Sequence, residues 1–120
     1  MSIRRRIKVE AGRKALHDWQ ATDTPDRATR ATAVRYSLEE LATRAPGNTV
    51  EVRVPPFGVT QCIAGPTHTR GTPPNVVETD ADTWLALVTG SLTWSQAVDQ
   101  ARVSATGTRS DLGEYLPLWP

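Results

Sequence analysis

The longest helix pattern of the chain lies between Pro25 and Pro46. Its apolar side chains recur at spacings of three and four residues, so they form one stripe along about five helical turns. They are Ala28, Ala31, Val34, Leu38, Leu41, Ala42 and Ala45. Thr24 has the hydroxyl of a helix N-cap, and the proline after it suits the first helical position. The pattern predicts an amphipathic helix whose small apolar residues pack closely against a sheet.

Strict alternation of apolar and polar residues follows this helix pattern. Val50, Val52 and Val54 fall on one face of a strand, and polar side chains fall on the other. A connection rich in proline and glycine, residues 55–58, leads to a second strand pattern. The chain from Val50 to Ala64 is therefore predicted to be a β-hairpin.

Two short helices that each contain a tryptophan are predicted on either side of Gly90. Each begins with the form of a capping box, in which a threonine is followed three residues later by an acid or an amide. The pairs are Thr79 with Asp82, and Thr93 with Gln96. Gly90 stands where the end of the first helix favours a left-handed residue. We expect the two helices to meet there.

Shorter patterns fill the rest of the chain. They predict a weak helix at 12–20, a short strand at 75–79, an alternating strand at 102–107, and a last helix at 108–116 that Pro117 ends. Strands that are grouped and then followed by helices favour an α+β sandwich over a doubly wound fold. With 120 residues, the chain is long enough for one such core.

Positive charge is concentrated at the N-terminal end. The net charge of +1 indicates no general affinity for nucleic acid, and we expect no nucleic-acid partner. Residues 1–20, however, hold six Lys or Arg against Glu10 and Asp18. This stretch is either a solvated tail or a basic arm for phosphates or an anionic membrane surface. We divide the chain into a basic segment with a short helix, residues 1–23, and a domain, residues 24–120.

The sequence contains no pattern for export or for crossing a membrane. No apolar run of roughly 7 to 15 residues follows the N-terminal arginines, as a secretory signal would need. No stretch approaches the roughly 20 apolar residues of a membrane span. A single cysteine, Cys62, excludes an internal disulfide and fits a reducing compartment. We expect a cytoplasmic protein without a transmembrane segment, for which peripheral contact with a membrane stays open.

The C-terminal third has a specific order of features: an acidic helix start, an apolar helix, Gly, a polar link, an Ala-containing helix, a basic and apolar strand, Gly, and a final helix. The residues that form it are Asp80, Asp82, Trp84, Leu85, Leu87, Gly90, Leu92, Ala97, Arg102, Val103, Gly107 and Leu112. This order resembles the closing segment of the sterol carrier protein type 2 family. From about Ala31 onward the chain is similar to the small single-domain bacterial branch. Ala101 stands where the family commonly has glycine, so the turn there can differ while the fold is kept.

The resemblance implies an α+β sandwich with a mixed, mainly antiparallel five-stranded sheet, covered by helices. It also implies an apolar cavity for acyl chains or sterol-like lipids, and hence a non-enzymatic lipid carrier. The residues expected to line the cavity are Phe57, Trp84, Leu87, Trp94, Leu112, Tyr115 and Leu116. The alternative is that these side chains fill the core. The chain would then be an accessory domain whose partner is another protein.

Few residues offer chemistry beyond this apolar set. His68 and Arg70, in a proline-glycine loop, are candidate contacts for an anionic head group, and the alternative is a solvated turn. Cys62 is expected to be a small buried hydrophobe, although an enzyme that uses Cys62 or His68 stays a third hypothesis. The histidines and the cysteine lack the spacing of metal ligands, and no glycine-rich phosphate loop occurs. We expect neither a metal, nor a cofactor, nor an enzymatic activity.

Overall fold

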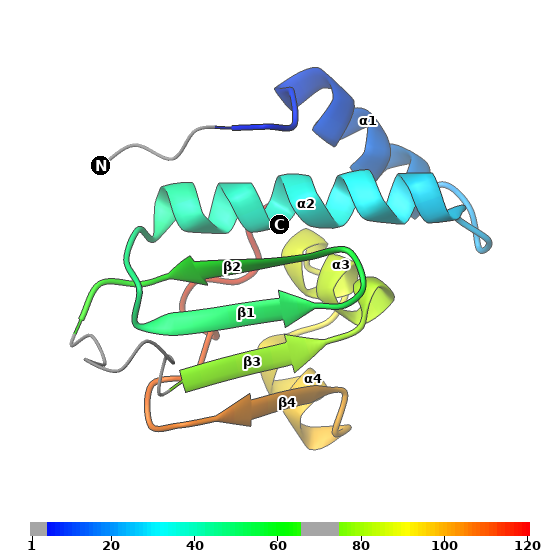
Figure 1. The fold of residues 1–120 in the computed structure, drawn as a ribbon. Helices are drawn as coiled ribbons and strands as arrows, with labels where there is room; N and C mark the ends of the chain where they lie inside the picture. The colour runs from blue at the N-terminus through cyan, green and yellow to red at the C-terminus, as the bar shows by residue number, and fades with distance from the viewer. Residues whose placement is uncertain (1–4, 66–74) are drawn as a thin grey trace.

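A computed structural model describes residues 5–65 and 75–120 of the chain (Figure 1). Within these residues it forms four helices and four strands. They are α1 (Val9–Gln20), α2 (Arg27–Arg44), β1 (Val50–Val54), β2 (Gly58–Cys62), β3 (Asn75–Thr79), α3 (Ala81–Thr89), α4 (Trp94–Asp99) and β4 (Val103–Thr106). The predicted α+β class is confirmed, and so are the hairpin β1–β2 and the strands β3 and β4.

The sheet is mixed, and its order is β2-β1-β3-β4. β1 pairs antiparallel with β2 and parallel with β3, and β3 pairs antiparallel with β4. The expected number of five strands is wrong for the described residues, which form a four-stranded sheet. Its mixed character is as expected, with two antiparallel pairings and one parallel pairing. β3 pairs with β1 and not with β2, which precedes it in sequence. Strand direction reverses from β1 to β2 and again from β2 to β3, so β3 runs parallel to β1.

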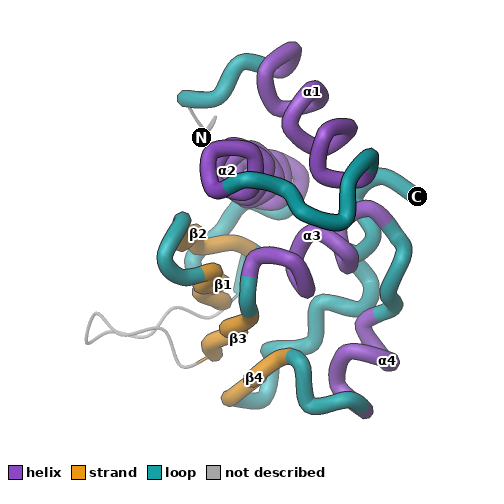
Figure 2. The backbone as a smooth tube through the Cα atoms, turned by 90° about the vertical axis from the view of Figure 1, so that its right-hand side faces the viewer, coloured by secondary structure: helices purple, strands orange, loops and turns teal. Residues whose placement is uncertain are grey.

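The helices cover one face of the sheet (Figure 2). α3 and α4 lie on that face, α2 runs along the β2 side, and α1 lies outside α2. Val50, Val52 and Val54 of β1 point to the helices and are fully buried, as the alternation predicted. The opposite face carries exposed residues such as Arg53 and Glu78.

The N-terminal helix α1 is packed against α2. Gly12 lies so close to α2 that a Cβ atom placed on it would stand 2.1 Å from Cγ of Tyr36. Ala15 and Leu16, on the same side of α1, are buried in the core that the sheet and the other helices share. The helix therefore contributes to the main core, while the division of the chain after residue 23 stays a prediction.

The start of α2 differs from the expected one. The N-cap is Asp26, whose carboxylate accepts a hydrogen bond of 2.7 Å from the N–H of Thr29, and the predicted cap Thr24 lies outside the helix. An ionised acceptor at the N-terminus also interacts favourably with the helix dipole, which a hydroxyl does not. The capping box of Thr93 and Gln96 at the start of α4 is present as predicted.

The start of α3 also lies one residue later than its capping-box pattern predicted. Asp80 is the N-cap and accepts hydrogen bonds from the N–H and the hydroxyl of Thr83. The predicted cap, Thr79, is the last residue of β3, and its hydroxyl donates to the carbonyl of Arg102. Pairing with β4 therefore takes Thr79 into the sheet.

The helix predicted at 108–116 does not form, and the segment consists of turns. The carboxylate of Asp111 accepts a hydrogen bond of 2.7 Å from the N–H of Gly113, which closes a local turn in competition with a helix. The N–H of Leu116 donates to the carbonyl of Leu112, which makes one isolated turn. Leu112 is nevertheless fully buried, so the apolar pattern correctly marked a residue that faces the core.

Two left-handed residues end the C-terminal helices. Gly90 ends α3 with a φ of 85°, as predicted. Ala101, which follows α4, adopts a φ of 55°. The N–H of Arg102 donates to the carbonyl of Ala97, and that of Ala101 to the carbonyl of Val98, which together form a Schellman motif. The turn therefore has the conformation that glycine favours, although alanine occupies it.

Candidate functional site

Three of the residues expected to line a cavity are packed into the core. Trp84 and Leu112 are 0% exposed and Leu87 is 1% exposed, so almost none of their surface is in reach of a water molecule. The indole N–H of Trp84 donates a hydrogen bond of 2.8 Å to the hydroxyl of Ser37 on α2. The polar atom of this tryptophan is thus satisfied inside the protein. At these three positions the expected cavity wall is a filled core.

Two others, Trp94 and Leu116, line an apolar groove at the surface. It has a volume of about 410 Å³, and we call it the Trp94 groove. Its lining residues are Gly90, Leu92, Thr93, Trp94, Ser95, Asp111, Gly113, Leu116 and Pro117. One wall is the link between α3 and α4 with the start of α4, and the other is the C-terminal segment.

Local structure explains why these walls stand apart. The left-handed Gly90 turns the chain out of α3, and the capping box of Thr93 fixes the direction in which α4 begins. The C-terminal segment is tied back to α3 because the N–H groups of Leu118 and Trp119 both donate to the carbonyl of Val88. That carbonyl belongs to the last turn of α3, where helix carbonyls lack a partner within the helix. Both walls are therefore anchored to the same helix end.

The lining of the Trp94 groove is suited to holding an apolar group. Leu92, Trp94 and Leu116 provide its larger apolar side chains. The one charged residue among the described lining residues is Asp111, whose carboxylate accepts a hydrogen bond from Gly113. Sequence reasoning missed Leu92 and Pro117 as lining residues. The signal that could have identified them is their apolar character, Leu92 directly before the N-cap of α4 and Pro117 at a turn of the C-terminal segment.

The other two residues of the expected lining lie elsewhere. Tyr115 borders a hollow of about 300 Å³ with Ile63, Arg109 and Glu114. Phe57 lies in the β1–β2 turn and is half-buried. The seven residues therefore divide between the core and several surface hollows. His68 and Arg70, the candidate head-group contacts, lie outside the described residues.

Cys62 is a buried residue of β2, as its position in the pattern predicted. It is 0% exposed, and burial raises the pKa of its thiol to about 12. The thiol therefore keeps its proton at neutral pH, whereas a nucleophilic cysteine needs an accessible thiolate.

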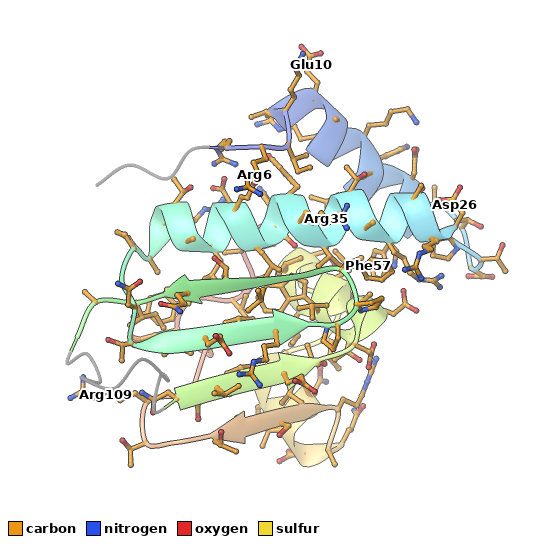
Figure 3. All side chains as sticks on the ribbon, viewed as in Figure 1. Arg6, Glu10, Asp26, Arg35, Phe57 and Arg109 are labelled. Carbon is orange, nitrogen blue, oxygen red and sulfur yellow. The ribbon has the colours of Figure 1, made fainter. Side chains whose placement is uncertain are left out.

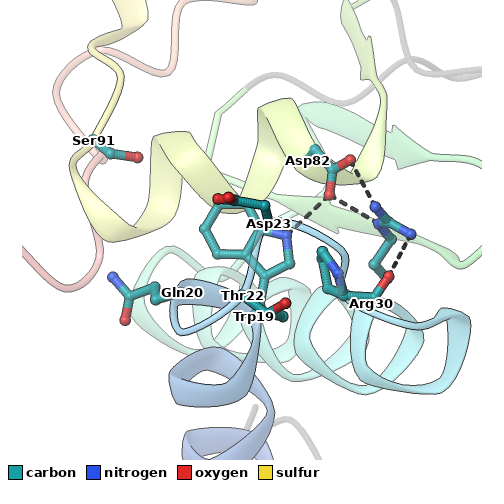
Figure 4. Close-up of a pocket in the computed structure, with 8 residues that line it drawn as sticks. Trp19, Gln20, Thr22, Asp23, Arg30, Asp82 and Ser91 are labelled. Carbon is teal, nitrogen blue, oxygen red and sulfur yellow. Dashed lines mark hydrogen bonds and ion pairs between the residues drawn. The ribbon is translucent and has the colours of Figure 1, made fainter.

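A cluster of hydrogen-bonded side chains from three helices lies beside a hollow of about 380 Å³ (Figure 4). The guanidinium of Arg30 on α2 donates to both carboxylate oxygens of Asp82 on α3, over 2.9 and 3.2 Å. The indole N–H of Trp19 on α1 donates to the same carboxylate over 2.9 Å. These hydrogen bonds, chiefly that from Arg30, hold the pKa of the Asp82 carboxyl below its usual value. Because the polar groups already satisfy one another, we interpret the cluster as a clamp between helices.

The structure is a small α+β domain with an apolar groove at its surface. The family model described as Bacterial SCP ortholog matches residues 26–118. The chain therefore belongs to this family of bacterial sterol carrier protein orthologs, as its sequence resemblance predicted. A comparison with curated proteins finds no match. In the described part of the chain, no helix combines the length and the apolar character that crossing a membrane requires.

Proposed function

We propose that the protein is a non-enzymatic lipid carrier that holds the apolar part of an acyl chain or a sterol-like lipid in the Trp94 groove. Membership of the bacterial SCP ortholog family supports a role in lipid binding. The observation that carries the proposal is the apolar lining on both walls, with Leu92 and Trp94 on one and Leu116 on the other.

The size of the groove supports a small apolar ligand. Ligand sites in proteins commonly measure about 300 to 1,000 Å³. At about 410 Å³, the Trp94 groove lies in the lower part of that range, which favours one acyl chain over two. Removing apolar surface from water contributes about 25 cal/mol per Å², so the affinity grows with the length of chain that the groove covers.

Carriage requires no reactive group. The thiol of Cys62 is buried, and its raised pKa keeps it neutral, which supports a role in packing. The same free thiol is compatible with a reducing compartment, and we place the protein's action in the cytoplasm on that ground.

Titration with a long-chain fatty acid tests the proposal. Intrinsic tryptophan fluorescence of the wild type should change and saturate at one ligand per chain, and Trp94→Phe should lose most of the change while calorimetry still detects binding. Leu116→Glu places a charge in the apolar wall and should weaken binding at least about tenfold. Val98→Glu is the matched control, because Val98 is 48% exposed on α4 and does not line the groove. Binding that Leu116→Glu leaves unchanged would contradict the site, and a failure of every lipid class to bind would contradict the function.

A second candidate function is an accessory domain that binds another protein. The observation that favours it is the burial of Trp84, Leu87 and Leu112 in the core, where almost none of their surface is in reach of water. Native mass spectrometry of the protein purified from its own cells distinguishes the two candidates. A lipid mass on the chain supports the carrier, and a stoichiometric protein partner without lipid supports the accessory domain.

A further inference from the structure

The β1–β2 turn lies beside arginines from two parts of the chain, the N-terminal segment and α2. Cζ of Arg27 lies 5.2 Å from the centre of the Phe57 ring, and Nε of Arg35 donates to the carbonyl of Phe57 over 2.9 Å. Arg6, Arg35, Phe57 and Val59 line one hollow of about 420 Å³. Figure 3 shows Arg6, Arg35 and Phe57 on the same side of the molecule, from the N-terminal segment, α2 and the turn. We call Arg6, Arg27, Arg35, Phe57 and Val59 the turn surface.

The described arginines divide into those with and those without an ion pair. Arg5, Arg30, Arg44 and Arg53 each pair with a carboxylate. The three arginines of the turn surface form no ion pair with any described residue, and neither do Arg13, Arg102 and Arg109, which do not line the hollow beside Phe57. The carboxylate of Glu39, which also lines the hollow, accepts the backbone N–H groups of Arg6 and Ile7. The guanidinium groups of Arg6 and Arg27, and the two terminal nitrogens of Arg35 beyond its bonded Nε, are therefore available for an external anion.

Exposed apolar residues accompany this charge. Val59 is 59% exposed, on the face of the sheet that the helices leave open. Pro55 and Pro56 in the turn are exposed, and Phe57 is half-buried. A pocket for one soluble ligand encloses its apolar residues, whereas Val59, Pro55 and Pro56 are exposed to solvent. Apolar side chains that project between cations are typical of a surface that meets the head-group region of a membrane.

We propose that the turn surface docks onto an anionic lipid membrane. The arginines bind lipid phosphates, while the proline-rich turn and Val59 reach the boundary of the acyl chains. Charge complementarity carries the choice of partner, since the three arginines outnumber the carboxylates of Glu39 and Glu78, which line the hollows beside Phe57 and Val59 without an ion pair. The proposal does not depend on the Trp94 groove, because the two surfaces share no lining residue.

Sedimentation with vesicles tests the docking. The wild type should bind vesicles of phosphatidylcholine with phosphatidylglycerol, but not vesicles of phosphatidylcholine alone, and high salt should release it. Each cation near such a surface strengthens binding about fivefold, so the double variant Arg27→Gln with Arg35→Gln should bind about 25-fold more weakly. Arg13→Gln with Arg109→Gln is the matched control, since it removes two exposed charges elsewhere. An equal loss in both variants, or no binding by the wild type, would overturn the proposal.

Further variants separate charge from folding. Arg27→Lys with Arg35→Lys keeps the charge and should retain most of the binding, and thermal unfolding checks that each variant is folded. Val59→Thr removes exposed apolar surface and should weaken binding about threefold. Val98→Thr, on exposed Val98 of α4, should have no effect. The double variant Arg27→Gln with Arg35→Gln should bind a fatty acid with the affinity of the wild type. The experiments therefore test membrane docking and lipid carriage separately, and either proposal can be refuted without the other.

Discussion

The indole N–H of Trp84 and the hydroxyl of Ser37 form a buried hydrogen bond of 2.8 Å between residues 47 positions apart. The hydroxyl in turn donates to the carbonyl of Val34 over 2.9 Å. Both Trp84 and Ser37 are 0% exposed, so neither polar group has water as a substitute. The pair joins α3 to α2 through the centre of the core.

Replacing Ser37 by alanine should therefore lower the free energy of unfolding by about 1 to 3 kcal/mol, because the N–H of Trp84 loses its acceptor in an apolar site. Denaturant unfolding measures the change. In a double-mutant cycle with Trp84→Phe, the loss caused by Ser37→Ala should become smaller when Phe is present, since Phe has no N–H to satisfy. Equal losses in the two backgrounds would show that the hydrogen bond contributes nothing.

Ala101→Gly should stabilise the protein by about 0.5 to 1 kcal/mol. A left-handed residue other than glycine costs about 1 to 2 kcal/mol, and the greater freedom of glycine in the unfolded chain offsets part of the gain. Gln100→Gly is the control, because Gln100 has a φ of −88° and glycine brings no relief of strain there. Gln100→Gly should lower the free energy of unfolding. If Ala101→Gly lowers it as well, the argument from backbone conformation is refuted.

The thiol of Cys62 should make stability depend on alkaline pH. Its pKa is about 12 in the folded protein and about 9 when unperturbed, so the unfolded chain releases this proton first as the pH rises. Between these values the free energy of unfolding should fall by about 1.4 kcal/mol per pH unit through this group. Other groups titrate there too, and the measurement is therefore the difference in slope between wild type and Cys62→Ala. Identical slopes would mean that the thiol titrates alike in both states.

Gly12→Ala should destabilise the protein by about 1 to 3 kcal/mol, although alanine favours a helix over glycine by about 1 kcal/mol. The added methyl group meets the ring of Tyr36, and this ring is stacked on Trp119 at 5.5 Å between centres and lies under Arg5. The ring therefore has little room to move away. Arg13→Ala, on the exposed side of α1, should leave stability nearly unchanged. Thermal unfolding of both variants measures the change in stability. A Gly12→Ala variant that is more stable than the wild type would show that α1 packs loosely against α2.

Signals that lie within a few residues of each other were sufficient to predict much of this fold. The apolar stripe of α2, the alternation of β1, the left-handed Gly90 and the capping box at Thr93 each depend on the local backbone and its nearest neighbours. Such features are encoded in spacing, since a helix and a strand repeat with different periods. The family pattern in the C-terminal third is likewise a matter of local order.

Only the tertiary structure decided which of these elements meet. It placed β3 beside β1, took Thr79 into the sheet, and left the segment after Gly107 without a helix. It also separated two tryptophans with similar local patterns: Trp84 closes the core, whereas Trp94 faces a groove. Periodicity specifies that a side chain is apolar and on a given face, but not which distant surface covers that face. That depends on contacts such as the one between Ser37 and Trp84, which form only when the whole core assembles.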